Sequence, residues 1–186
     1  MAVESANLAL SACPRAERVT YGYYHGRYLL NQHRVVEAAD VLQEAFFRCC
    51  RGARGNKRRI LIFLTIASIM TDSAPTMALL QKYQLEAQFG GLIREQRRGH
   101  LAGYFCELSA YSSWHAHLGT LLLLHQYGMR MVYRNLFRRV YVLLGLPTAE
   151  KPRLRLVDLV AACHVSAGGV VEPDHDVDEV ISLLAH

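Results

Sequence analysis

Apolar residues recur along this chain with the period of an α-helix, and the strict alternation typical of exposed β-strands is almost absent. The clearest stripe lies within residues 34–50 and contains Val35, Ala38, Ala39, Leu42, Ala45, Phe46 and Cys49. The preceding residues 21–32 fit a second helix, in which Gly26 would allow the two helix axes to approach closely. The pattern therefore predicts an all-α protein that starts with a helical hairpin.

A third helix is expected after a glycine-rich linker at 52–55, where Asn56 fits the N-cap of a helix over 57–71. Its apolar stretch, residues 60–70, is interrupted by two hydroxyl side chains and is far shorter than the roughly 20 residues of a membrane crossing. We therefore expect a buried helix and no membrane partner. The N-terminus also lacks the basic start and the sustained apolar core of a cleaved signal, which argues against secretion.

Glycine and proline residues divide the next part of the chain into shorter helices. Their expected ranges are 75–80, 89–98, 101–117 and 120–127. Gly99 and Gly128 are expected to end two of these helices. Paired helices with short connections indicate stacked hairpins, a tetratricopeptide-like solenoid, over 19–128, after a flexible N-terminus at 1–18.

The stretch 129–144 combines an apolar face with a basic back. Its predicted buried sector contains Tyr133, Leu136, Phe137, Val140, Tyr141 and Leu144. Arg138 and Arg139 project from the opposite side of this helix, with Arg134 at the margin. A charged outer face is by default solvated, so the sequence pattern alone leaves open whether this face has a partner.

The elements after this helix are short. A turn-rich break at 145–152 precedes a helix expected at 156–163 and a last helix beginning at Asp176 or Asp178. One face of the last helix contains Val177, Val180, Ile181 and Leu184. Three short helices at this scale indicate a helix-turn-helix or winged-helix module over 129–186. The apolar face would need a cover, so its residues are candidates for partner binding.

Basic and acidic residues are segregated along the chain. One run without acids contains Arg48, Arg51, Arg54, Lys57, Arg58 and Arg59. Acids concentrate near the end of the sequence, at Glu172, Asp174, Asp176, Asp178 and Glu179. With 21 Lys and Arg against 16 Asp and Glu, the formal net charge is +5, which is compatible with an anionic partner without requiring one.

No residue cluster has the spacing of a catalytic or metal site. His115 and His117 are two apart, so on a helix their side chains point away from each other. Because the sequence also lacks a phosphate-binding glycine loop and the GxSxG and HExxH motifs, we expect no enzyme activity, metal or cofactor. The five cysteines have no CxxC spacing and are interpreted as reduced thiols of an intracellular protein. Helical packing, rather than base stacking, is the interpretation for Tyr21, Tyr23, Tyr24, Tyr28 and Tyr104.

Five segments, taken in order, resemble the PCI-domain family. They read VTYGYYHGRYLLNQ, NKRRILIFLTIASIM, LLQKYQLE, YRNLFRRVYVLL and DVDEVISLLAH. Members of that family have helical repeats fused to a C-terminal winged helix, and they are scaffold subunits of the proteasome lid, the signalosome and translation initiation factor 3. Within the family, the segments look most like a subunit of the nuclear transcription-and-export complex 2, which acts in mRNA export, and its signalosome-associated relative.

The resemblance implies a non-enzymatic subunit that docks on a large scaffold protein and binds a small acidic tethering peptide. It also implies RNA or DNA, held without strong sequence preference by basic residues in the matching segments. These residues are Lys57, Arg58, Arg59, Arg134, Arg138 and Arg139. The implied location is the nucleus, including the nuclear pore, with the cytoplasm as an alternative.

Two departures from the family pattern affect these expectations. Family members have more helical repeats, and their winged helix ends in a β-hairpin wing, whereas this sequence stops at His186. We therefore expect a truncated winged-helix module without its wing. The alternative function is a protein-only scaffold in a signalosome-like or proteasome-lid-like assembly, in which the arginines would bind acidic peptides.

Overall fold

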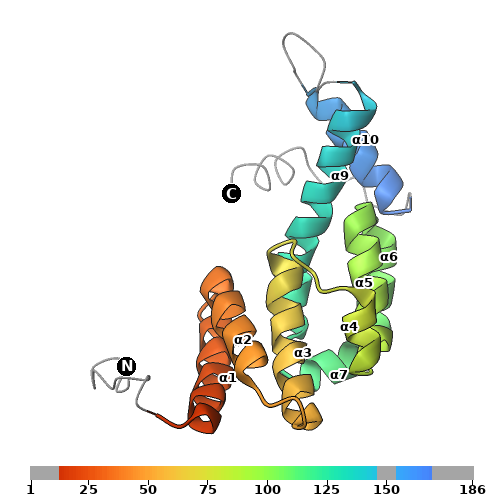
Figure 1. The fold of residues 1–186 in the computed structure, drawn as a ribbon. Helices are drawn as coiled ribbons and strands as arrows, with labels where there is room; N and C mark the ends of the chain where they lie inside the picture. The colour runs from red at the N-terminus through yellow and green to blue at the C-terminus, as the bar shows by residue number, and fades with distance from the viewer. Residues whose placement is uncertain (1–12, 146–153, 169–186) are drawn as a thin grey trace. The chain divides into compact units, whose positions relative to one another are not determined.

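The computed structural model describes residues 13–145 and 154–168, and all regular structure in these ranges is helical (Figure 1). The predicted all-α class is confirmed. The chain divides into two compact units, Met1–Pro75 and Thr76–His186. The residues expected to bind a partner, Val177, Val180, Ile181 and Leu184, lie outside the described residues, as does the end of the predicted winged-helix part.

The first unit begins with the predicted hairpin, formed by α1 (Arg15–Asn31) and α2 (Val35–Arg48) (Figure 1). α1 begins inside the segment expected to be flexible. The reason is a tertiary contact, because the Arg15 Nε donates a hydrogen bond to the Arg48 carbonyl at 2.6 Å and fixes the first turn.

Close helix approach in this hairpin depends on two glycines of α1. A Cβ placed at Gly26 would lie 2.4 Å from the Cγ of Leu42, which is fully buried. At Gly22, an added Cβ would lie 3.1 Å from the Cβ of Ala45. The close approach expected at Gly26 is therefore confirmed.

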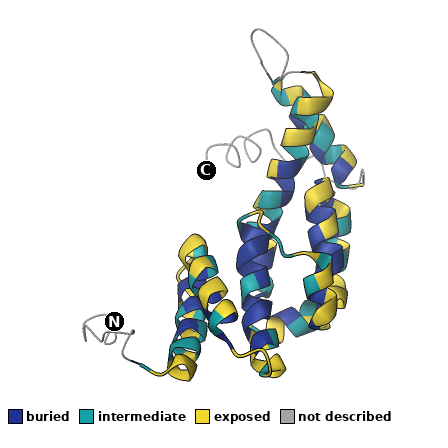
Figure 2. Cartoon of the chain, viewed as in Figure 1, coloured by how far each residue is buried: buried dark blue, intermediate teal, exposed yellow. Residues whose placement is uncertain are grey.

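The third helix, α3 (Arg54–Met70), starts earlier than the sequence pattern predicts. The expected N-cap at Asn56 is wrong, because the Ala53 carbonyl already accepts a hydrogen bond from the Lys57 N–H at 3.0 Å. The Lys57 side chain fixes this first turn by donating to the Phe46 carbonyl at the end of α2, also at 3.0 Å. The second half of α3 is buried almost all round, as expected (Figure 2).

The second unit contains the remaining helices. They are α4 (Met77–Lys82), α5 (Glu86–Arg98), α6 (Leu101–Ala110), α7 (Ser112–His117), α8 (Leu121–Leu123), the π-helical turn η2 (Leu124–Gly128), α9 (Met129–Leu143) and α10 (Leu156–Ser166). The predicted end at Gly99 is confirmed, since this residue adopts the left-handed conformation with φ 67°. The single helix expected at 101–117 is instead two helices.

The expected helix end at Gly128 is wrong. Helical structure continues from Leu121 to Leu143 through the π turn, and Gly128 has ordinary helical angles. Its role is to leave space, because a Cβ there would lie 1.9 Å from the hydroxyl oxygen of Tyr104. That hydroxyl donates to the Leu124 carbonyl at 2.9 Å, which satisfies a backbone group in the π turn. The division into helical repeats and winged-helix part expected after residue 128 therefore falls inside a continuous helix.

Burial decreases along α9, from buried residues near its start to exposed residues at its end (Figure 2). Tyr133 is buried as predicted, whereas Leu136 and Phe137 are only half-buried. Leu144, just after the helix, is 47% exposed. The predicted buried sector is therefore only half-buried in the second half of the helix, and the prediction is wrong for Leu144, because the neighbouring helices cover that half only in part.

Candidate nucleic-acid interface

A groove with a volume of about 360 Å³ lies where the end of α5 meets the second half of α9. It is lined by Arg97, Asn135, Arg138, Arg139, Val142 and Leu143. Arg138 and Arg139 were predicted from the sequence, and both are exposed as expected. Arg97 was missed, although the basic end of α5 was visible in the sequence. Only the fold shows that α5 and α9 bring these guanidinium groups to one groove.

The position of α9 against α5 is determined by two contacts beside this groove. Asn135 is buried, and its amide Nδ2 donates to the Gln96 carbonyl at 3.1 Å. Gly99 lies directly against the backbone of Leu136, because a Cβ at Gly99 would be 2.6 Å from the Leu136 nitrogen. Glycine is therefore needed at 99 for two reasons, the positive φ and the close approach of α9.

The turn that follows α5 also holds α10. Ser166 Oγ donates to the Gly99 carbonyl at 2.6 Å and accepts from the Leu101 N–H at 2.8 Å. Both hydrogen bonds are buried, and they join residues more than sixty positions apart in the sequence. The groove is thus built on a junction of four helices, which holds its arginines on a fixed frame.

A second charge cluster beside the groove is satisfied internally. Glu95 is buried and contacts His100 at 2.8 Å, Arg98 at 3.1 Å and Arg94 at 3.4 Å. Burial by itself raises the pKa of Glu95, but the hydrogen bond from His100 and the positive charge of Arg98 outweigh it, so the pKa is lowered. These arginines are therefore engaged with a carboxylate.

Arg138 and Arg139 differ from the arginines around Glu95. No acidic side chain among residues 13–145 and 154–168 forms an ion pair with either of them. Arg134, the third arginine predicted on this helix, is exposed but does not line the groove. Two guanidinium groups on one helix edge, without an ion pair to a described carboxylate, can hold successive phosphates.

The three basic residues predicted on α3 have different environments. Lys57 is 8% exposed, and its ammonium group lies 4.5 Å from the centre of the Phe46 ring in addition to its bond to the Phe46 carbonyl. The ammonium group of Lys57 is therefore held between α2 and α3 and is not part of the exposed surface. Arg58 is half-buried, and Arg59 is exposed.

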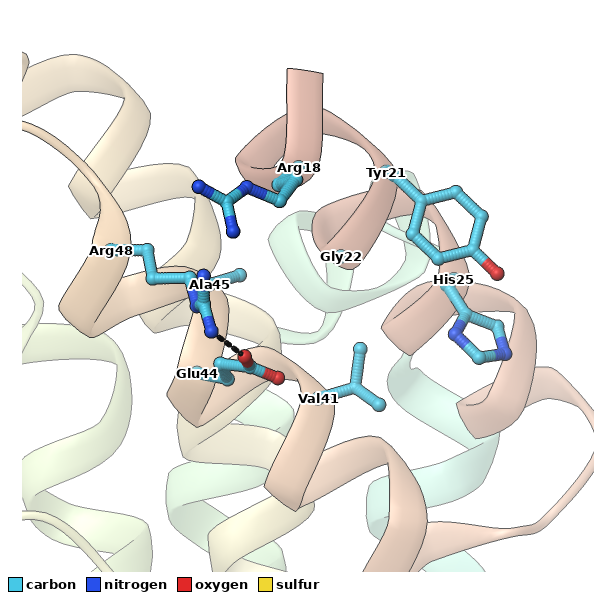
Figure 3. Close-up of a pocket in the computed structure, with 8 residues that line it drawn as sticks. All are labelled: Arg18, Tyr21, Gly22, His25, Val41, Glu44, Ala45 and Arg48. Atoms are coloured by element: carbon cyan, nitrogen blue, oxygen red, sulfur yellow. Dashed lines mark ion pairs between the residues drawn. The ribbon is translucent and has the colours of Figure 1, made fainter. Parts of the chain in front are cut away.

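A separate pocket of about 380 Å³ lies between α1 and α2 (Figure 3). Arg18 extends into it from α1, and its buried Nε has no hydrogen-bond partner among the described residues. On the α2 side, Arg48 forms an ion pair with Glu44 at 2.6 Å. The Glu44 carboxylate would repel an anion at this place, so the α5–α9 groove suits phosphate better.

Similar proteins are found among curated sequences, although no family model matches the chain. PCI domain-containing protein 2 of Danio rerio is 34% identical over 185 residues, which is 100% of this chain. The chain is a homologue of the PCI domain-containing proteins. A PCI domain-containing protein of Schizosaccharomyces pombe is 31% identical over 96% of the chain, and a CSN12 homolog of Gibberella zeae is 28% identical over 95%.

The predicted resemblance to PCI proteins is thus confirmed, and it extends over nearly the whole sequence. This PCI homologue spans only 43% of the Danio rerio protein and 40% of the other two. Within the part of the chain that the structure describes, none of the helices combines the length and the apolar character needed to cross a membrane.

Proposed function

We propose that this PCI homologue is a non-enzymatic scaffold subunit of a multiprotein complex and that it binds nucleic acid on the α5–α9 groove. The observation that carries the proposal is the presence of Arg97, Arg138 and Arg139 on one groove. Guanidinium groups pair with phosphate oxygens, and such contacts give affinity without reading base sequence. The expected ligand is therefore RNA or DNA of any sequence.

The cellular setting that we propose is mRNA export coupled to transcription, in the nucleus and at the nuclear pore. Its support is the likeness to the PCI domain-containing proteins together with the segment order described above. The partners would be a large scaffold subunit and a small acidic tethering peptide. Val177, Val180, Ile181 and Leu184 are the proposed contacts to the scaffold subunit.

The nucleic-acid proposal is tested by replacing Arg138 and Arg139 together with glutamate. Because both side chains are exposed, the helix content and the melting temperature should stay close to those of the wild type. The affinity for single-stranded RNA, measured by fluorescence anisotropy at several salt concentrations, should fall for every sequence tested. The slope of log K against log salt should become shallower by about 2, one for each lost phosphate contact.

A charge-matched control replaces Arg34 and Arg155 with glutamate. These exposed residues already form ion pairs with Glu37 and Asp158, so they are less available to phosphate, while the change in net charge is the same. A folded Arg138→Glu, Arg139→Glu variant that binds RNA as tightly as this control would refute the groove as a nucleic-acid site.

A protein-only scaffold is the second candidate, and the apolar part of the groove favours it. Val142 and Leu143 line the groove beside the arginines and are 57% and 84% exposed. Exposed apolar residues next to basic ones also suit an acidic, amphipathic peptide. The absence of salt-dependent binding to RNA, together with co-purification of protein partners identified by mass spectrometry, would favour this function over the first.

A further inference from the structure

Two tyrosines of α1 are exposed, although the sequence pattern places them at packing positions. Tyr24 is 62% exposed and Tyr28 is 47% exposed. They are four residues apart on one helix, so their side chains lie on the same face, with roughly 5–6 Å between Cβ atoms. Core packing does not explain these two exposed rings, which offer flat apolar surfaces to a ligand.

The ring of Tyr24 contacts one aromatic neighbour, Tyr23, which is itself packed. Its centre lies 5.1 Å from that of Tyr23, in an edge-to-face arrangement. Tyr23 in turn packs against Phe63 of α3 at 5.7 Å, and the guanidinium of Arg27 lies 4.6 Å from the Phe63 ring centre. This support restricts the motion of the Tyr24 ring, so binding a ligand to it costs little conformational entropy.

A hollow with a volume of about 160 Å³ lies between α1 and α3, beside Tyr23 and Tyr24. On the α3 side it is lined by two polar residues of the first turns, Asn56 and Arg59. Arg59 is exposed, and within the described ranges it forms no ion pair with a carboxylate. An aromatic face, a cation and an amide therefore lie next to one another, from two helices of the same compact unit.

We propose that this surface binds a single-stranded segment of nucleic acid, with one base stacked on Tyr24 and the adjoining phosphate on Arg59. The next base would stack on Tyr28, and the Asn56 amide would contact a base edge. The inference rests on the proposed function, and it specifies the ligand further. The bases of a duplex stack on one another and hide their faces, so only a single strand can use exposed tyrosines.

The hollow suits nucleic acid because it combines three kinds of group that a nucleotide can contact. The groups available at the surface are a guanidinium and an amide beside the aromatic rings, which match phosphate, base edge and base face respectively. Stacking tolerates every base, so this surface, like the α5–α9 groove, would not select a sequence.

The test uses the full chain with single-stranded RNA that contains one 2-aminopurine, and with the same RNA as a duplex. Stacking on a tyrosine should quench 2-aminopurine fluorescence when the single strand binds. Tyr24→Ala should abolish most of this quenching and weaken single-strand binding roughly 5- to 150-fold, the range for one stacked base. Tyr24→Phe keeps the aromatic face and should retain both, and duplex affinity should not change in either variant.

Phe47→Ala is the matched control, because Phe47 is an exposed aromatic residue of the same unit, 68% exposed on α2. It should change neither the quenching nor the affinity. If Tyr24→Ala binds and quenches like the wild type while Arg138→Glu, Arg139→Glu weakens binding, this inference is overturned and the proposed function stands. If Tyr24→Ala binds RNA like the wild type but no longer co-purifies with a protein partner, the surface is a protein-docking site and the inference is also overturned.

Discussion

Lys57 and Arg59 belong to one run of basic residues, and the structure places them in opposite environments. Residues two apart on a helix point to different sides, so a continuous basic run on a helix cannot be a continuous basic surface. Lys57 shares its face with Ile60 and Leu61, three and four positions on, which are both buried. The helical spacing of the apolar residues around Lys57 already contained this information.

Among single residues, a buried histidine has the clearest expected effect on the pH dependence of stability. His115 is fully buried, and its ring lies 5.5 Å from Phe89 and 4.9 Å from Trp114, measured between ring centres. Within the described part of the chain, neither ring nitrogen makes a hydrogen bond of good geometry. Burial lowers the pKa of His115 from 6.5 to about 4, against a weaker opposing effect from the Gln88 backbone.

We predict that His115 makes the protein less stable in mild acid. In the unfolded chain this histidine takes up a proton near pH 6.5, whereas in the folded protein it resists until about pH 4. Its contribution is therefore complete above pH 6.5 and is lost as the pH falls toward 4, by up to about 3 kcal/mol. Urea unfolding midpoints measured across this range should decrease, and His115→Leu should make the decrease smaller.

His117→Leu is the control for this experiment. His117 is exposed on the same helix, so its replacement should leave the pH dependence of the wild type unchanged. Identical pH profiles for the wild type and His115→Leu would show that the buried ring does not resist protonation.

At the scale of single helices, glycine has opposite roles in α1 and α3. Gly26 faces the buried side chain of Leu42, so it permits the close packing of the hairpin. Gly55 is in the first turn of α3, and no atom of the described residues lies within 4 Å of a Cβ added there. The same residue type therefore supports tertiary packing in one helix and only weakens the other.

We predict opposite effects for alanine at these two positions. Gly26→Ala should lower the free energy of unfolding by roughly 1–3 kcal/mol, because the overlap with Leu42 exceeds the gain in helix propensity. Gly55→Ala should raise it by roughly 0.4–1 kcal/mol, since it stiffens the unfolded chain without a clash. Chemical denaturation of both variants measures the difference, and a stabilised Gly26→Ala would show that α1 and α2 are farther apart than described.

At the scale of the whole chain, the second unit depends on contacts between distant segments. Ser166 near the end of α10 binds both the Gly99 carbonyl and the Leu101 N–H in the turn between α5 and α6. The sequence gives no signal for these hydrogen bonds, because a lone serine on a helix is most often exposed.

Ser166→Ala should destabilise the protein by roughly 2–4 kcal/mol, because it leaves two buried backbone groups without their hydrogen-bond partner. The unfolding midpoint in urea and the hydrogen exchange of the Leu101 amide measure this effect. Ser113→Ala, at an exposed position of α7, should have almost no effect on either measurement. Unchanged protection at Leu101 would mean that water or another group replaces the Ser166 hydroxyl.

The amino-acid sequence by itself determined the helical class, the order of the helices, the hairpin with its glycine contact and the exposed position of Arg138 and Arg139. These features follow from local spacing, since the period of apolar residues decides both the type of element and which side of it can be buried. The likeness to PCI proteins was also visible in the sequence segments and was confirmed by the relatives.

Only the tertiary structure decided which helix faces are covered. It placed Arg97 beside Arg138 and Arg139, buried Lys57 against Phe46, and left Tyr24 exposed. Spacing along a helix specifies the direction of a side chain but not the neighbour that it meets, because that neighbour comes from a distant part of the sequence. The groove and the surface around Tyr24 are each formed by residues of two separate helices, and for that reason no local pattern could predict them.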